Sequence, residues 1–400
     1  MNSKSNKRKW RVAYVITVLL IITIILMSGC TDIHNTLSAS PVVVSGIPTE
    51  SPEPIIVPKP TDSPLKFMIE GSYMIKEDGS LWAWGYNTHG QVGDGTTENR
   101  NAPVHVMDDV KCVSADGNHV LALKEDGSLW AWGCNDKGQV GNGNTEDALI
   151  PIQVLDDIKD IDAGSEHSLA IKEDGSLWAW GCNTFGQLGN GNTENTGTPV
   201  KVLEGVKSVA AGRNHSLAVL EDGSLWSWGQ NAYYQLGDED MKDRPVPMKV
   251  MEGVHAVEAG FNYSLAIMQD RSLHTWGENN RGQLGFGITY GAMLLQLPVM
   301  YDVKSVVTGV DCTLALKNDG SLWAWGLNTF NQLGNDTVDF ENQANAVPVC
   351  VMSGVKAVFA GNWCNFALTE DGSLWAWGDY GYIIGEEGEG NESPIMIEID

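Results

Sequence analysis

The sequence predicts an all-β protein whose main domain is a seven-bladed β-propeller of four-stranded antiparallel blades. The segment DGSLWAWG occurs seven times with small changes, at steps of 48 residues four times and then 49 and 52. A repeat of this length with two tryptophans per unit is typical of propeller blades. Glycine is abundant, with 45 of 400 residues, which suits short strands joined by tight turns. The copies begin at Asp78, Asp126, Asp174, Asp222, Asp270, Asp319 and Asp371.

Residues 206–251 show how four strands fit into one unit. Four extended segments alternate with turn residues, and neighbouring segments are close enough in the chain to pair antiparallel. Seven such units predict seven four-stranded blades. The four predicted strands lie at residues 206–212, 215–220, 225–229 and 247–251.

The second and third strands of this unit are joined by Asp222-Gly223. This pair predicts a type I′ hairpin turn, in which both central residues need a positive φ. Trp226 and Trp228 follow on one face of the third strand, because side chains alternate along a strand. Since the tryptophans recur from unit to unit, we expect them to fill the space between neighbouring sheets rather than to bind a ligand.

Residues 1–30 have the layout of a bacterial export signal. A basic start precedes an apolar stretch over residues 12–27, which is short for a membrane span. Met27-Ser28-Gly29-Cys30 resembles the lipobox of bacterial lipoproteins, although Met27 departs from the usual leucine. The resemblance implies that Cys30 carries lipid and anchors the protein to the cell membrane on its extracytoplasmic side. An uncleaved signal anchor is the alternative, and it predicts the same side.

Residues 31–64 are rich in proline, serine and threonine and show no hydrophobic period. Such a segment is expected to stay extended and solvated, with a reach of roughly 3 Å per residue. We therefore divide the chain into a signal peptide over residues 1–30, a stalk over 31–64 and a propeller over 65–400.

The charge balance argues against nucleic acid as a partner. The formal net charge is −26, and five of the 25 basic residues lie in the first 11 positions. The rest of the chain therefore carries 20 basic against 51 acidic residues. A surface this acidic repels phosphate backbones.

Six cysteines follow Cys30, and their spacing has neither a metal-binding nor a disulfide-framework pattern. We expect them to be small apolar fillers, and a bridge between Cys134 and Cys182, which share one repeat position, stays open. His119, His167 and His215 also share one position, at the start of a strand. Equivalent positions lie apart around a ring, so we expect each histidine to make a local hydrogen bond rather than to join a metal site.

The motifs AGxxHSLA, EDGSLWAWG and NxxGQLG resemble the repeat of the regulator of chromosome condensation family, over nearly all of residues 65–400. Members of that family form seven-bladed propellers, so the resemblance implies the same fold as the repeat count. Three units depart from the pattern: the first is short, the fifth reads QDRSLHTWG, and the last carries an insert over residues 381–390. In the fifth, Arg271 replaces the turn glycine, at a cost of about 1 kcal/mol if φ stays positive.

The two ends of the propeller are both predicted strands. Residues 65–69 match the first strand of a blade, and residues 394–399 match the last. Either one end joins the sheet of the other and latches the ring, or the first and last blades meet by side-chain packing alone.

No catalytic or cofactor-binding motif occurs in the chain. There is no nucleophile–base set, no phosphate-binding loop before a helix and no HExxH-type metal site. The GDGT segment at residues 93–96 lacks the spaced acidic ligands of a calcium loop and is interpreted as a turn. We therefore expect no enzyme activity, no cofactor and no metal.

An antiparallel meander determines which loops share a face of the propeller. Loops from the first to the second strand and from the third to the fourth lie on one face, and the Asp-Gly hairpins lie on the other. The first face carries aromatic and arginine residues that differ between blades, a composition typical of protein-binding surfaces. The expected binding residues are His89, Phe185, Arg213, Tyr233, Tyr234, Phe261, Arg281, Phe330, Trp363 and Tyr380.

Three functions compete on these grounds. The first is an extracytoplasmic module that binds an unknown protein partner, as the resemblance to secreted β-lactamase inhibitor proteins with similar repeats implies. The second is nucleotide exchange on a small GTPase, which the resemblance to eukaryotic family members implies but an exported location opposes. The third is glycan binding at the envelope through exposed aromatic side chains. We favour the first.

Overall fold

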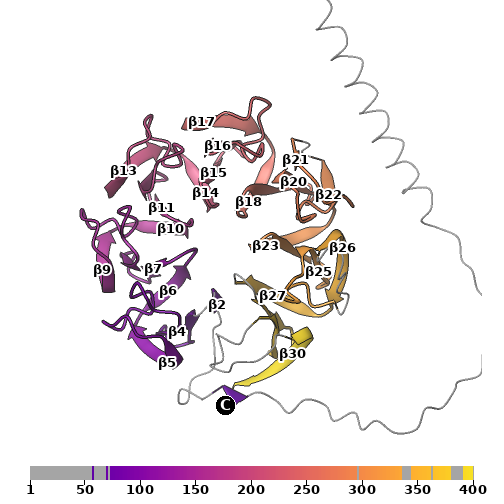
Figure 1. Ribbon diagram of the computed structural model, residues 1–400, viewed down its shortest axis with the longest axis horizontal. Coiled ribbons are helices and arrows are strands. Elements are labelled where there is room, and N and C mark those ends of the chain that lie inside the picture. The colour runs from indigo at the N-terminus through magenta and orange to yellow at the C-terminus, as the bar shows by residue number, and fades with distance from the viewer. Residues whose placement is uncertain are drawn as a thin grey trace, which may run out of the picture. The chain divides into compact units, whose positions relative to one another are not determined.

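The structure is a computed structural model, and it describes residues 56–57, 69–70, 73–294, 297–335, 344–361, 364–379 and 391–399. The chain divides into Met1–Glu53, which lies outside the described residues, and Pro54–Asp400. The second unit is a ring of seven β-sheets around a central axis, and all described elements are strands (Figure 1). The predicted seven-bladed propeller is therefore confirmed. In each blade we name the strands A to D, from the inner strand to the outer one.

Blades 1 to 4 follow the chain in order. Blade 1 contains β2 (Ile69–Glu70), β3 (Tyr73–Ile75), β4 (Leu81–Gly85) and β5 (Arg100–Met107). Blade 2 contains β6 (Val110–Ser114), β7 (His119–Lys124), β8 (Leu129–Gly133) and β9 (Ala148–Leu155). Blade 3 contains β10 (Ile158–Ala163), β11 (His167–Lys172), β12 (Leu177–Gly181) and β13 (Thr196–Leu203). Blade 4 contains β14 (Val206–Ala211), β15 (His215–Leu220), β16 (Leu225–Gly229) and β17 (Arg244–Met251).

Blades 5 to 7 complete the ring. Blade 5 contains β18 (Val254–Ala259), β19 (Tyr263–Met268) and β20 (Leu273–Glu278), with an outer strand divided into β21 (Ala292–Met293) and β22 (Pro298–Met300). Blade 6 contains β23 (Val303–Gly309), β24 (Cys312–Lys317), β25 (Leu322–Leu327) and β26 (Ala344–Met352). Blade 7 contains β27 (Val355–Ala360), β28 (Cys364–Thr369), β29 (Leu374–Gly378) and β30 (Asn391–Ile399), with β1 (Ile56–Val57) at its outer edge.

The ring is latched by a strand from the N-terminal side of the propeller. β1 pairs in parallel with β30, placing Ile56 opposite Glu398 and Val57 opposite Ile399. These two residues lie within the segment that the sequence predicted to be a stalk. The N-terminal part of the chain thus contributes β1 to blade 7 and β2 to blade 1, and main-chain pairing joins the two ends.

The hairpin between strands B and C differs from the predicted type. In blade 4, Gly223 has a φ of 79°, whereas Asp222 is not among the residues with positive φ. The N–H of Gly223 donates to the Leu220 carbonyl, and the N–H of Leu220 donates to the Ser224 carbonyl, both at 2.9 Å. This is a three-residue loop ending in a left-handed glycine. Asp222 instead accepts the N–H of Ser224 at 2.8 Å, so the prediction of a type I′ turn was wrong.

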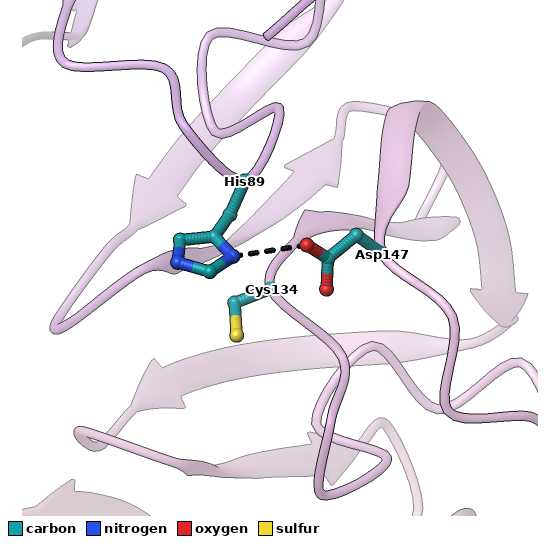
Figure 2. Close-up of side chains that lie close together, drawn as sticks. All are labelled: His89, Cys134 and Asp147. Atoms are coloured by element: carbon teal, nitrogen blue, oxygen red, sulfur yellow. Dashed lines mark hydrogen bonds and ion pairs between the residues drawn. The ribbon is translucent and has the colours of Figure 1, made fainter.

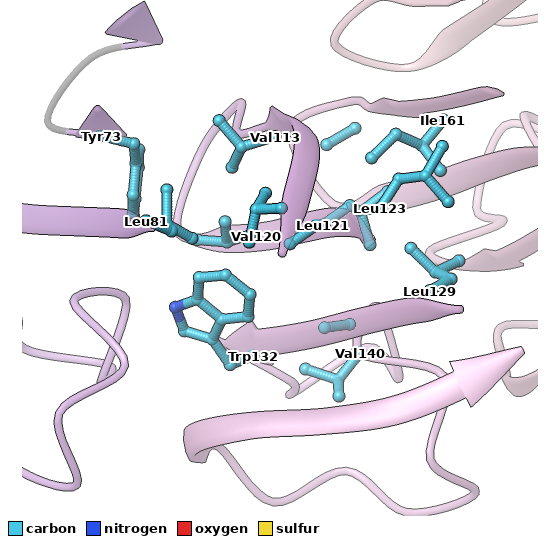
Figure 3. Close-up of a cluster of buried hydrophobic side chains, with 14 of the residues drawn as sticks. Tyr73, Leu81, Val113, Val120, Leu121, Leu123, Leu129, Trp132, Val140 and Ile161 are labelled. Atoms are coloured by element: carbon cyan, nitrogen blue, oxygen red, sulfur yellow. The ribbon is translucent and has the colours of Figure 1, made fainter. Parts of the chain in front are cut away.

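The second tryptophan of strand C joins neighbouring blades in six of the seven repeats. Trp132 is fully buried and its Nε1–H donates to the Gln91 carbonyl of the preceding blade at 2.9 Å. The same bond recurs at five further junctions, from Trp180, Trp228, Trp276, Trp325 and Trp377. Trp132 also packs within a cluster that runs from blade 1 to blade 3 (Figure 3). The hydrophobic core is therefore continuous between blades rather than enclosed within each one.

The first tryptophan has a different environment. Trp130 is only half-buried, and its Nε1–H donates to Ser128 Oγ of its own hairpin at 3.0 Å. The expectation that both tryptophans fill the space between sheets is therefore confirmed for the second one and too broad for the first.

Arg271 occupies the left-handed position of its hairpin with a φ of 66°, as the sequence indicated. Replacing it with glycine removes a strained side-chain residue, so Arg271→Gly is expected to raise the free energy of unfolding by up to about 1 kcal/mol. The reverse change in a regular blade, Gly223→Arg, should lower it by about 1–2 kcal/mol. Urea denaturation of both variants checks the pair, and a loss of stability in Arg271→Gly would contradict the strain argument.

Candidate functional site

The strand order places the predicted binding residues on one face of the propeller. We call this the loop face, formed by the A-to-B and C-to-D loops, and the opposite side the hairpin face. Arg213 and Phe261 lie in A-to-B loops, and the C-to-D loops carry the others that the structure describes. Cys30, Trp363 and Tyr380 lie outside the described residues.

Five predicted residues share a single repeat position, which the sequence reasoning did not recognise. Each lies two residues after the asparagine of an NxxGQLG-type segment and donates its backbone N–H to the side-chain oxygen of the glutamine two residues later, at 2.8–3.0 Å. Lys137 of blade 2 is held in the same way and was missed. The five predicted members are His89, Phe185, Tyr233, Arg281 and Phe330.

Further hydrogen bonds hold the C-to-D loops where the structure describes them. In blade 2 the side chain of Asn135 is fully buried, and its Oδ1 accepts the N–H of Val140 at 2.9 Å. Its Nδ2 donates to the carbonyls of Asn144 and Glu146 at 3.2 and 2.9 Å. The loop face thus presents variable side chains on a repeated, hydrogen-bonded frame, an arrangement common in binding sites.

Arg213 and Phe261 pair across the junction of blades 4 and 5. The guanidinium carbon of Arg213 lies 4.3 Å from the centre of the Phe261 ring, a cation–π contact. The N–H of Arg213 also donates to the Phe261 carbonyl at 3.3 Å. Arg213 is exposed while Phe261 is half-buried. An apolar ring and a charged group therefore reach the loop face together.

Tyr234 makes the same junction unusual. It has a φ of 63° and occupies the position of a glycine in neighbouring repeats. At the equivalent Gly186, an added Cβ would lie 2.5 Å from the Pro245 Cα of the next blade's outer strand. In a regular repeat, a side chain at this position would therefore press against the outer strand of the next blade.

The strand-B histidines were wrongly expected to make local hydrogen bonds. Nε2 of His119 and His167 lies 2.9 Å from the Oγ of Ser168 and Ser216, each 49 residues later in the next blade. His215 makes the equivalent contact at 3.0 Å. Burial lowers the pKa of His119 to about 4 and that of His167 and His215 to about 3. These neutral histidines join blades.

All six cysteines after Cys30 are free thiols, so the bridge left open between Cys134 and Cys182 is not formed. Cys134 is half-buried and lies at the junction of blades 1 and 2, near His89 and Asp147 (Figure 2). His89 Nδ1 is 2.9 Å from Asp147 Oδ2. Among the described residues, these three form the one group with the ligand types and proximity to hold a metal ion.

Within the part of the chain that the structure describes, no helix has the length and apolar character needed to cross a membrane.

Residues 69–295, more than half of the chain, match the family model of the RCC1-like domain. Two further models, both of the regulator of chromosome condensation (RCC1) repeat, match residues 319–368 and 303–332. No curated protein matches the sequence.

Several solved structures resemble the propeller. Prp20p from Saccharomyces cerevisiae is 22% identical, with a TM-score of 0.68 over 82% of this chain and 87% of Prp20p. Yeast RCC1 (Prp20) bound to Kap60 is 21% identical, with a TM-score of 0.69 over 92% of this chain and 91% of that one. Human WBSCR16 is 20% identical, with a TM-score of 0.69 over 80% of this chain and 94% of WBSCR16. At sequence identities of this level, the similarity establishes that these proteins share the propeller fold.

Proposed function

The chain belongs to the family of RCC1-like domains, and from that premise we propose that it is a protein-binding scaffold that captures its partner on the loop face. The observation that carries this proposal is the ring of side chains at one repeat position on that face. A position that only supports the fold keeps one residue type, as the buried Asn135 and its equivalents show. The neighbouring position instead holds histidine, lysine, phenylalanine, tyrosine and arginine on an unchanged frame.

The junction of blades 4 and 5 is the best candidate for the centre of the binding surface. Arg213, Phe261, Tyr233 and Tyr234 lie there, and aromatic and arginine residues are enriched where binding energy concentrates. Tyr290, in the next C-to-D loop, is 67% exposed. Exposed tyrosine supplies contact area with few rotatable bonds to immobilise, which favours binding.

The family's partners support a protein ligand without identifying it. Yeast Prp20p binds Gsp1p and histones, and its structure has been solved with Kap60 bound. The strongly acidic composition of the present chain favours a neutral or basic partner. We propose a binding role rather than an enzymatic one, because no catalytic motif occurs in the sequence.

We further propose that the scaffold works outside the cytoplasm, tethered to the cell membrane by lipid on Cys30. The support is the basic start, the short apolar stretch and the lipobox-like Met27-Ser28-Gly29-Cys30. The proline-rich residues after Cys30 would hold the propeller clear of the lipid surface. Metabolic labelling with a fatty acid analogue, compared between the wild type and Cys30→Ala, tests the anchor.

The amount of partner protein that variants retain tests the proposal that the loop face is the binding surface. We expect the double variant Arg213→Ala/Phe261→Ala to retain a partner at least about tenfold less well than the wild type, because it removes the central aromatic and its cation. Cross-linking on intact cells followed by mass spectrometry measures the retained protein. Thermal unfolding should change little, since Arg213 is exposed and Phe261 half-buried.

Tyr301→Ala is the matched control. Tyr301 is 62% exposed and lies in the turn between β22 and β23, on the hairpin face. The Tyr301→Ala variant should retain as much partner protein as the wild type. Equal loss in both variants would contradict the choice of face, and capture of polysaccharide instead of protein would favour the glycan-binding alternative.

A further inference from the structure

Three metal-binding residue types meet at the junction of blades 1 and 2 (Figure 2). His89 comes from the C-to-D loop of blade 1, Cys134 directly follows β8, and Asp147 directly precedes β9. One ligand atom from each lies within 4.8 Å of the other two. The side chains of His89 and Asp147 are 39% and 35% exposed, so an ion can reach them from solvent.

The backbone positions of the three residues are held by hydrogen bonds of the repeat itself. The N–H of His89 donates to Gln91 Oε1 at 2.8 Å, and the N–H of Cys134 donates to the Asn118 carbonyl at 2.8 Å. Asp147 Oδ1 accepts the N–H of Asn135 at 2.9 Å. The second carboxylate oxygen stays directed at His89, and such orientation by neighbouring groups supports metal binding.

The repeat does not itself require these residue types. At the next junction the equivalent positions hold Lys137, Cys182 and Asn195, and a lysine there opposes a cation. At the following junction they hold Phe185, Gln230 and Asp243. Packing and loop geometry are thus satisfied by other side chains, and the combination of imidazole, thiol and carboxylate occurs at only the first of these three junctions.

We propose that His89, Cys134 and Asp147 bind one Zn²⁺ ion, with water as the fourth ligand. Zinc accepts nitrogen, sulfur and oxygen ligands in tetrahedral geometry, and three protein ligands plus water are common in its open sites. Bond lengths of about 2.0–2.3 Å place tetrahedral ligand atoms about 3.3–3.5 Å apart. His89 Nδ1 and Asp147 Oδ2, at 2.9 Å, are already close to this separation. The Cys134 thiol lies 3.6 Å from Asp136 Oδ1, and its side chain must turn away from that contact to bind the ion.

Binding must displace a proton. As the Zn–S bond forms, the S–H bond breaks and the proton passes to solvent. The apparent zinc affinity should therefore fall about tenfold for each unit that the pH is lowered.

The ion would connect two blades. His89 belongs to blade 1 and the other two ligands to blade 2, so zinc would add a link beside the Trp132–Gln91 hydrogen bond. A ligand that binds only the folded state stabilises it in proportion to the logarithm of its concentration above Kd.

The test uses the metal-free full chain with its thiols kept reduced by a non-thiol reductant. Titration with Co²⁺ should give a thiolate-to-cobalt charge-transfer band at one ion per chain, and Zn²⁺ should abolish that band. Calorimetric titration with Zn²⁺ should show an affinity about a hundredfold weaker or more in Cys134→Ser and in His89→Gln. Zn²⁺ should raise the thermal unfolding temperature of the wild type more than that of either variant.

Cys182→Ser is the matched control, since Cys182 has the same repeat position but a lysine in place of the histidine. It should bind Zn²⁺ as the wild type does. The acidic surface supplies weak carboxylate sites, which all variants share. A missing charge-transfer band, or equal zinc affinity in the wild type and Cys134→Ser, would overturn the proposal.

Discussion

Trp132→Ala should lower the free energy of unfolding by about 4 kcal/mol, the usual cost of removing a fully buried tryptophan. Its side chain is completely enclosed and bridges the sheets of blades 1 and 2. The substitution leaves a cavity at an interface where backbone strands cannot easily move together. It also removes the hydrogen bond to the Gln91 carbonyl. Chemical denaturation followed by tryptophan fluorescence and by circular dichroism measures the change.

Trp130→Ala is the control within the same strand. Trp130 is half-buried and bonds only to Ser128 of its own hairpin, so we expect a loss of about 1–2 kcal/mol. Trp132→Phe removes the indole hydrogen bond but keeps most of the buried aromatic volume. We expect it to lower the free energy of unfolding by about 1 kcal/mol, because the Gln91 carbonyl still accepts a hydrogen bond from Tyr73. If Trp130→Ala were as costly as Trp132→Ala, the tryptophan between blades would not be the principal joint.

Asp162→Asn should stabilise the propeller at alkaline pH by about 2 kcal/mol. Asp162 lies on β10 and connects three inner strands. Its carboxylate accepts the Ser114 hydroxyl of blade 2 at 3.0 Å and the Ala211 N–H of blade 4 at 2.7 Å. Burial raises its pKa to about 7, and the negative charges of Asp160 and Asp116 add to this. Partial contact with solvent keeps the expected gain below the full value of the pKa shift.

The direction in which pH changes the contribution of Asp162 to stability follows from the number of protons bound by the folded and unfolded states. In the unfolded chain Asp162 titrates near its usual pKa of 3.8, whereas the folded chain holds the proton up to about pH 7. Between these values the folded state binds more protons, so stability from this group is lost as pH rises. The buried histidines act in the opposite direction, since unfolding lets them take up protons below their usual pKa of 6.5. The two effects partly cancel in the wild type.

The comparison of variant and wild type isolates Asp162 because the histidines are common to both. Urea denaturation at a series of pH values should show no difference near pH 4, an advantage for Asp162→Asn that grows as the pH rises to about 7, and a constant advantage above that pH. Ser114 can accept from the new amide, so the hydrogen-bond geometry survives. A variant less stable than the wild type at pH 8 would show that the two accepted hydrogen bonds outweigh burial.

The repeat in the sequence was enough to predict the blades, but not the turns within them. The strands of blade 4 fall where the alternation of residues placed them, apart from an earlier start of β17 at Arg244. The Asp222-Gly223 turn was assigned wrongly because Asp-Gly pairs occur in two- and three-residue loops alike. The choice depends on the pairing of Leu220 with Ser224, which the dipeptide does not reveal.

The polar contacts between blades could not be predicted from the sequence. His167 and Ser216 are 49 residues apart, and nothing in a single repeat indicates that one reaches the other. The ring of variable side chains on the loop face was overlooked for a different reason. His89 and Phe185 were selected as unusual residues, while Lys137 was missed because a surface lysine is ordinary. Their common position, two residues after the asparagine of the NxxGQLG motif, could have been read from the sequence, and the structure adds the glutamine that holds each backbone.

By itself the sequence determined the number of blades, the order of strands and the face on which loops gather, because each follows from a period and from antiparallel pairing. Only the tertiary structure decided which side chains cross from blade to blade, how β1 latches the ring and that His89, Cys134 and Asp147 converge. Those contacts depend on the angle and distance between neighbouring sheets. That geometry arises from packing the whole ring, and no local stretch of residues encodes it.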